Sequence, residues 1–183
     1  MLRLTIPERE YFDNSKGEFV YIKQQTLELE HSLISISKWE SRWKKPFLPD
    51  GPKTKRETSD YIYCMTLNSH VDPNVYVGLP DSILKQTFDY INDEMTATWF
   101  NENKFNKRKG GRSQAVTSEL IYYWMISFGI PFECQKWHLN RLLTLIRICE
   151  IKNTPSKKMK RKDIFAQNAA LNAARKKNLG TNG

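Results

Sequence analysis

The sequence predicts an α+β fold: a small N-terminal antiparallel sheet packed on a mainly helical body, with a basic C-terminal helix. Apolar and polar residues alternate in residues 1–34, as in strands with one buried face. Over 35–151 the apolar residues instead recur at helical spacing. Residues 152–183 are basic and rich in alanine. We therefore expect a single globular domain over 1–151, followed by a basic tether and a helix.

About three strands are expected in the N-terminal region. The first, LRLTI, places its apolar residues on one face, and the second, EFVYI, is β-branched and aromatic and follows the turn-forming stretch DNSKG. The third, TLELEHSL, places Leu27 and Leu29 inward and Glu28 and Glu30 outward. Because these carboxylates alternate with buried leucines, we interpret them as a solvated strand face and not as a catalytic pair.

A short helix with an aromatic stripe is predicted in SISKWESRWKKPF. Ser37 and Glu40 have the spacing of a capping box, Trp39 and Trp43 lie one turn apart, and Pro46 ends the segment. A helix beside a small sheet must bury one face, so the two tryptophans are expected in the core. The alternative is an exposed site for a partner protein.

Two further helices are predicted from their start signals. Thr54 and Glu57 repeat the capping-box spacing before TSDYIYCMTL, and Asp81 or Ser82 can cap ILKQTFDYIND. One face of the second helix carries Leu84, Phe88 and Ile91.

A helical hairpin is predicted to form the core. Its first helix, over 116–128, is apolar nearly all round, which indicates burial, and Gly129 with Pro131 separates it from a partner helix over 132–152. The seam of the partner helix consists of Leu139, Leu142, Ile146 and Cys149.

Two helices joined by a glycine-containing turn also outline a helix-turn-helix motif for DNA. A recognition helix needs exposed polar side chains at its start. This one begins instead with Phe132, Cys134, Trp137 and Leu139, so packing is the favoured role.

A basic segment over 101–114, NENKFNKRKGGRSQ, lacks apolar periodicity and is expected to be an exposed loop. A phosphate-contacting hairpin is the functional alternative to a solvated connection. The segment lacks the strand-to-helix context and the GK[ST] ending of a phosphate-binding loop, which favours the solvated connection.

No catalytic, cofactor or metal site is predicted, and the chain is expected not to be an enzyme. Cys134 and His138 have the spacing that places a thiol and an imidazole on one helical face, but His31 and His70 lie in distant segments and no orienting acid is evident. We expect ordinary packing of a buried cysteine and a bordering histidine. The three cysteines lack CxxC spacing and are expected to be free thiols, and no GxSxG, HExxH or GxGxxG motif occurs.

Several long stretches carry a family resemblance: LELEHSLISISKWESRWKKPFL, DYIYCMTL, MTATWF, ELIYYWMISFGIPFECQKWHLNRLLTLIRICEIKN and RKDIFAQNAALNAARKKNLGT. Together they cover almost the whole chain and resemble a family of tailed-bacteriophage proteins encoded in the tail module. Members of this family are described as tail assembly chaperones, which bind the tape measure protein while the tail tube polymerises. The resemblance implies an assembly role and brings no catalytic residues with it.

The C-terminal tail is the predicted partner-binding segment. From Lys152 onward it has nine Lys or Arg and one acid, so it carries +8 of the net charge of +9. DIFAQNAALNAARKK should form a helix from Asp163, whose acid suits the N-terminus while the final bases suit the C-terminus. Its alanines form a small-residue face, and NTPSKKMKRK before it is expected to be a tether. The residues expected to contact a partner are Arg161, Phe165, Ala169, Ala170, Ala173, Arg175, Lys176 and Lys177.

The leading expectation is a non-enzymatic phage tail assembly protein that contacts the tape measure or tail tube protein, or further copies of itself. The first alternative is a structural component of the tail or head–tail connector. The second is a nucleic-acid-binding accessory protein whose tail bases neutralise phosphates, and a merely solubilising tail is the simplest interpretation. The chain begins without the apolar run of a signal peptide and has no membrane-spanning stretch, so we expect the host cytoplasm or the virion.

Overall fold

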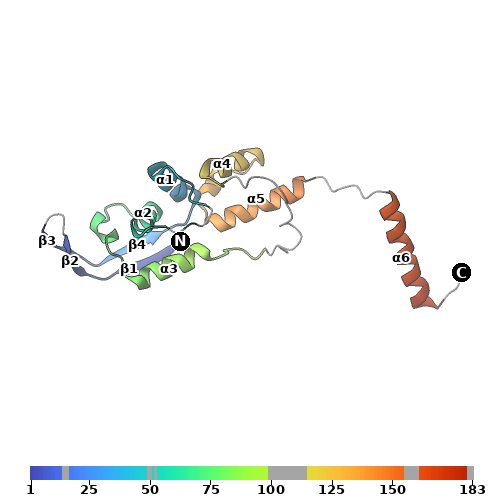
Figure 1. Ribbon diagram of the computed structural model, residues 1–183, viewed down its shortest axis with the longest axis horizontal. Helices are drawn as coiled ribbons and strands as arrows, with labels where there is room; N and C mark the ends of the chain where they lie inside the picture. The colour runs from blue at the N-terminus through green and yellow to red at the C-terminus, as the bar shows by residue number, and fades with distance from the viewer. Residues whose placement is uncertain (14–16, 49–50, 52, 99–114, 155–160, 181–183) are drawn as a thin grey trace. The chain divides into compact units, whose positions relative to one another are not determined.

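The computed structural model describes residues 1–13, 17–48, 51, 53–98, 115–154 and 161–180. It confirms the predicted α+β class (Figure 1). The chain divides into two compact units, Met1–Glu150 and Ile151–Gly183. In chain order the elements are β1 (Leu2–Ile6), β2 (Arg9–Asp13), β3 (Glu18–Ile22), β4 (Gln25–Leu29), α1 (Leu33–Trp43), α2 (Lys55–Met65), η1 (Pro73–Tyr76), α3 (Asp81–Asn92), α4 (Ser118–Ser127), η3 (Phe132–Lys136), α5 (Leu139–Asn153) and α6 (Arg161–Leu179).

Four strands, not three, are found in the N-terminal region, and they form the two halves of one long hairpin. β1 pairs with β4 and β2 with β3, both antiparallel, and the register is continuous, because Ile6 faces Gln25 and Arg9 faces Ile22. Pro7 lies between the halves and has no N–H to donate to the ladder. The prediction overlooked β2, REYFD, because three of its five residues are charged.

Arg9 fastens the far half of the hairpin to the body. The guanidinium of Arg9 donates hydrogen bonds to the backbone carbonyls of Val75 (2.8 Å) and Val77 (2.6 Å), near η1. Further along the ladder, the facing pair Tyr11 and Val20 is partly buried, and the Tyr11 hydroxyl donates a hydrogen bond to Asn74 Oδ1 (3.4 Å). Phe12 and Phe19 face each other across the strands with ring centroids 5.1 Å apart, and both are exposed.

The outer edge of β4 is covered by the chain that leaves α2. Leu67 N donates to Glu28 O (2.8 Å), and Glu30 N donates to Met65 O (2.9 Å). A covered edge has its backbone groups satisfied and does not pair with another chain. The inner face of the near half is buried as the alternation predicted, through Leu4, Ile6, Leu27 and Leu29.

α1 begins earlier than predicted. Ser32 is its N-cap and forms a capping box with Ser35, so the predicted pair of Ser37 and Glu40 lies inside the helix. The pair Ser32 and Ser35 caps the helix soon after the chain leaves β4, which ends at Leu29.

Glu40 has a different role from the predicted cap. Its carboxylate is buried, Oε1 accepts a hydrogen bond from Phe47 N, and Oε2 accepts one from Ser118 N, each at 2.8 Å. Ser118 is the first residue of α4, where backbone N–H groups are unpaired and a negative charge is favourable. One carboxylate thus ties α1 to the loop that follows it and to the start of α4.

Trp39 lies in the core, as predicted, whereas Trp43 lies at its edge. Trp39 is fully buried and its Nε1 donates to Glu57 O (3.0 Å). Trp43 is partly buried and its Nε1 donates to Asp60 Oδ2 (3.0 Å). The two indole rings stack with centroids 6.0 Å apart. Because Glu57 and Asp60 both lie in α2, both tryptophans contribute to the contact of α1 with α2.

The capping box of Thr54 and Glu57 is confirmed at the start of α2. The predicted cap of α3 is wrong: Asp81 is already the first helical residue, and the N-cap is Pro80, which offers no side-chain hydrogen bond. The core-facing residues of α3 are Ile83, Thr87 and Tyr90, whereas the predicted apolar face of Leu84, Phe88 and Ile91 lines a pocket.

α4 is less buried than predicted. Ile121 and Met125 are buried, but Tyr123 and Ile126 are 63% and 65% exposed. A short helix that packs mainly on one neighbour, here α1 (Figure 1), leaves its other side open whatever its composition. The predicted break at Gly129 is confirmed by its left-handed conformation, with φ at 64°.

The predicted partner helix over 132–152 is two elements. η3 is a short 3-10 helix, and α5 begins only at Leu139, so Cys134 and His138 do not share a helical face. The predicted seam is confirmed, since Leu139, Leu142 and Ile146 are buried and Cys149 packs against the core. The core is nevertheless not a helical hairpin alone, because the hairpin strands, α1 and α2 supply much of it. The three cysteines are free.

Three predicted features lie outside the described residues: the hairpin turn at 14–16, the basic loop over 101–114, and positions 155–160 of the tether.

Candidate functional site

The predicted partner-binding residues lie in α6, which begins at Arg161 and not at Asp163. Every side chain described on this helix is exposed, including Phe165 at 72% and Leu179 at 74%. Of the predicted contact residues, the exposed ones are Phe165, Ala169, Ala170, Ala173, Arg175 and Lys176. The side chains of Arg161 and Lys177 are outside the description.

Helical spacing places the alanines of α6 on one face. These residues follow the pattern i, i+3, i+4, i+7, i+8 and comprise Ala166, Ala169, Ala170, Ala173 and Ala174. Small residues let a second backbone approach a helix closely. Arg175 and Lys176 lie near the C-terminal end, where positive charge suits the helix dipole. The helix therefore offers a compact contact face together with charge at one end.

Two histidines that the sequence does not connect meet in the unit Met1–Glu150. His31 follows β4 and His138 precedes α5, and their ring centroids lie 5.0 Å apart. The backbones are joined as well, because Leu139 N donates to His31 O (2.7 Å) and Ser32 forms an antiparallel bridge with His138. Both imidazoles are buried, at 3% and 6% exposure.

Both rings are hydrogen-bonded within the protein. His138 Nε2 donates to Tyr90 O (3.0 Å), and its Nδ1 accepts from Asn140 N (3.3 Å), which is the pattern of a neutral imidazole. His31 Nδ1 is hydrogen-bonded to the Tyr61 hydroxyl. Burial, and secondarily the nearby His138, lowers the pKa of His31 to about 3, and burial also lowers the pKa of His138.

The histidine pair fits a structural role. A general base must reach its substrate, whereas these rings are enclosed and already paired. Burial raises the pKa of Tyr61, so its hydroxyl keeps its proton. Within the described ranges no group of three or more His, Cys, Asp or Glu side chains is placed to hold a metal ion. The pair joins the junction between β4 and α1 to the junction between η3 and α5.

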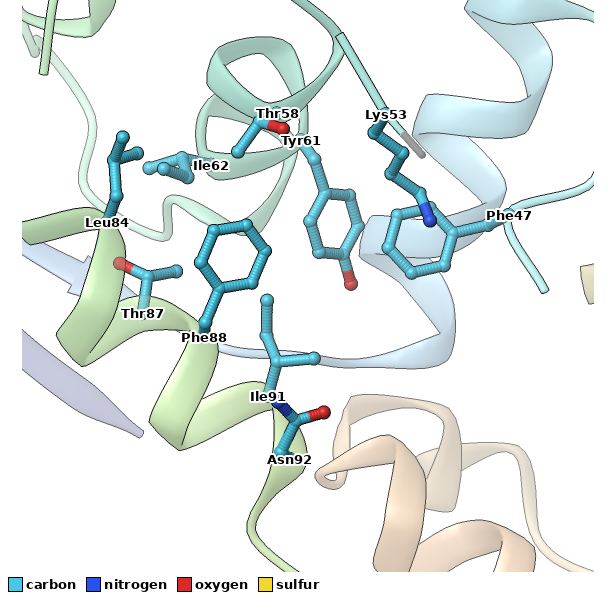
Figure 2. A pocket seen from close by; sticks show the side chains of 10 residues that line it. All are labelled: Phe47, Lys53, Thr58, Tyr61, Ile62, Leu84, Thr87, Phe88, Ile91 and Asn92. Atoms are coloured by element: carbon cyan, nitrogen blue, oxygen red, sulfur yellow. The ribbon is translucent and has the colours of Figure 1, made fainter. Parts of the chain in front are cut away.

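A small pocket opens between α2, α3 and the segment that follows α1 (Figure 2). Its volume is about 250 Å³. The most deeply buried lining residues are Phe47, Tyr61, Ile62 and Thr87. The α3 side is formed by Leu84, Phe88 and Ile91. The sequence indicated this α3 face but not that, among the described residues, it would line an open pocket.

Basic side chains gather at the mouth of this pocket. Lys53 Nζ lies 4.2 Å from the centroid of the Phe47 ring, a cation–π contact that Figure 2 shows at the edge of the pocket. A broader groove adjoins the pocket and also carries Arg42, Lys55, Arg56, Asp60 and Asp81.

The groove has an excess of positive charge. Arg42 is paired with Asp60 at 2.6 Å. In the part of the chain that the structure describes, no salt bridge is recorded for Lys53, Lys55 or Arg56. These three cations outnumber the remaining acid, Asp81.

In the described ranges no helix has the length and apolarity to cross a membrane. No protein-family model matches the chain, and no curated protein and no solved structure matches it either.

Proposed function

We propose that the chain is a non-enzymatic bacteriophage tail assembly protein that acts through protein–protein contacts. The phage context comes from the resemblance of its long aromatic segments to tail-module proteins. The observation that carries a contact role is α6, a helix of 19 residues whose described side chains are all exposed. Most of the stability of a helix in a protein comes from tertiary packing, so packing against a partner would stabilise α6.

The proposed partner is the tape measure protein or the tail tube protein, bound through the alanine face of α6. Replacing Ala170 and Ala173 with Leu keeps helix propensity high but blocks close approach, so co-purification with the partner should be lost. Replacing Lys176 and Lys177 with Gln should weaken binding less and mainly at low salt. The reverse ranking would refute docking through the small face.

Truncation after Asn153 is the matching control for folding. The buried core residues of the described chain all lie in Met1–Glu150, so the truncated chain should stay folded and lose only partner binding. Far-UV circular dichroism and thermal unfolding check the first expectation, and co-purification checks the second.

Deletion of the gene in its phage tests the assembly role directly. Electron microscopy should show heads with absent or aberrant tails, and normal tails would refute the proposal. Mass spectrometry of purified wild-type particles then separates two forms of it. A tail assembly chaperone should be scarce in the particle, whereas a structural component of the tail or connector should be abundant.

Nucleic-acid binding is the second candidate function, favoured by the +8 charge of the tail. Binding that neutralises several phosphates weakens steeply between low and moderate salt. Fluorescence anisotropy with a labelled duplex across this range would detect it. Partner binding through an apolar face should change little over the same range.

A further inference from the structure

The pocket between α2 and α3 has the size of one side chain. Engineered cavities of roughly 150 Å³ hold benzene, and sites for drug-sized ligands begin at roughly 300 Å³. At about 250 Å³ the pocket lies between these limits. It therefore has room for one aromatic or branched aliphatic side chain.

The lining of the pocket suits an apolar occupant. Its base consists of the rings of Phe47 and Tyr61, whose centroids are 4.1 Å apart, together with Ile62. The ring of Phe88 on α3 lies among the lining side chains (Figure 2), and this residue is 46% exposed. An apolar side chain in the pocket would cover this ring and remove its surface from water, which is favourable.

The mouth of the pocket suits a carboxylate beside that side chain. Lys53 is held over Phe47 by the cation–π contact, and Lys55 and Arg56 follow along the adjoining groove. Asn92 also lines the pocket and is exposed, so its amide is free to bond to a partner backbone. A basic segment would be repelled here, and a neutral one would leave the cations unpaired.

We infer that this pocket and groove bind an acidic segment of a partner protein that inserts one large apolar side chain between α2 and α3. The inserted side chain acts as the anchor, and its neighbouring carboxylates pair with Lys53 and the groove bases. The surface uses only residues of Met1–Glu150. The inference thus stands or falls separately from binding by α6.

Selection of short random peptides displayed on yeast, with the full-length chain as bait, tests the inference. The enriched peptides should share one Phe, Trp, Leu or Met with Asp or Glu close to it in sequence. Enrichment of basic peptides, of peptides without an apolar anchor, or of no common pattern would overturn it.

Synthetic copies of the enriched peptides then locate the site by fluorescence anisotropy. Thr58→Trp fills the pocket from α2 and should weaken binding by about tenfold or more, as expected for loss of an anchor contact. Lys53→Glu should weaken binding several-fold at low salt and should recover affinity for a peptide whose acids are changed to Lys. Lys85→Glu makes the same charge change at an exposed position of α3 outside the pocket lining and should have little effect.

Phe88→Glu provides a second pocket variant if Thr58→Trp does not fold. Because Phe88 is already 46% exposed, this change should leave the fold intact, which circular dichroism checks, and should repel an acidic segment. Wild-type affinity in a folded pocket variant, or equal loss in Lys85→Glu, would overturn the assignment of this site.

Discussion

Replacing His31 with Asn is expected to reduce the loss of stability in acid. In the folded chain the pKa of His31 is about 3, whereas a histidine in an unfolded chain titrates near roughly 6.5. Between these values the unfolded state binds a proton that the folded state does not. The free energy of unfolding therefore falls as the pH decreases through this window, and the loss is absent above it.

The size of the effect follows from the same two values. One proton difference changes the free energy of unfolding by about 1.4 kcal/mol per pH unit. Because an unfolded histidine is only half protonated at pH 6.5, the His31 contribution between pH 6.5 and pH 4.5 is about 2 kcal/mol. This is a large part of the stability of an ordinary domain, about 5–15 kcal/mol. His138, whose pKa burial also lowers, acts in the same direction.

Urea unfolding followed by tryptophan fluorescence across this pH range provides the measurement. An Asn at position 31 still offers an amide to the Tyr61 hydroxyl but does not titrate. His70→Asn is the matched control, because His70 is exposed and its φ of 65° is one that Asn tolerates. The reasoning is refuted if the curves of wild type and His31→Asn remain parallel from pH 6.5 to pH 4.5.

Three further perturbations test the core and its thiols. Trp39→Ala should lower the free energy of urea unfolding by about 3–5 kcal/mol and Trp43→Ala by clearly less, because only Trp39 is fully buried; equal costs would contradict this. Glu40→Gln places an amide group against one of two backbone N–H donors and should cost about 1–3 kcal/mol, so an unchanged thermal midpoint would count against the buried carboxylate link. Burial raises the pKa of Cys64 to about 11, which leaves about a thousandth of it as thiolate at pH 8, so Ellman's reagent should label the partly exposed Cys149 first. Equally rapid labelling of Cys64 would contradict its burial.

Local sequence patterns were sufficient for much of the fold. Strict alternation identified the strand with Leu27 and Leu29, and the box of Thr54 and Glu57 located the start of α2. Ser32 and Ser37 both have the spacing of an N-cap for α1. Which of them begins the helix depends on where β4 ends, and the spacing of nearby residues does not give that position. The exposure of Tyr123 on α4 escaped prediction for a related reason. The hydrophobicity of a side chain indicates only that burial would be favourable. Whether it is buried depends on which helices and strands pack against it.

The candidate sites were harder to predict than the fold. The exposed helix with its alanine face follows from composition and helical spacing within one segment. The contact of His31 with His138, by contrast, requires two junctions far apart in the sequence to meet. The pocket exists because no element of the described chain covers the apolar face of α3 that includes Phe88. The pattern of residues within one segment does not indicate whether another segment will cover it.

The shared register of the two hairpin halves bears on how the chain folds. Once β2 and β3 pair, each further residue pair of the ladder closes only a short additional loop. The pairing can therefore extend stepwise from β2 and β3 to Leu2 and Leu29, without a separate long-range contact having to form first. Pro7 removes one hydrogen bond from the ladder but leaves the register of the two strands unchanged. Inserting one residue beside Pro7 would shift the register by one residue and turn Leu2 and Leu4 from the core face to the solvent face. The hairpin thus tolerates the missing hydrogen bond at Pro7, whereas it would not tolerate an inserted residue at this position.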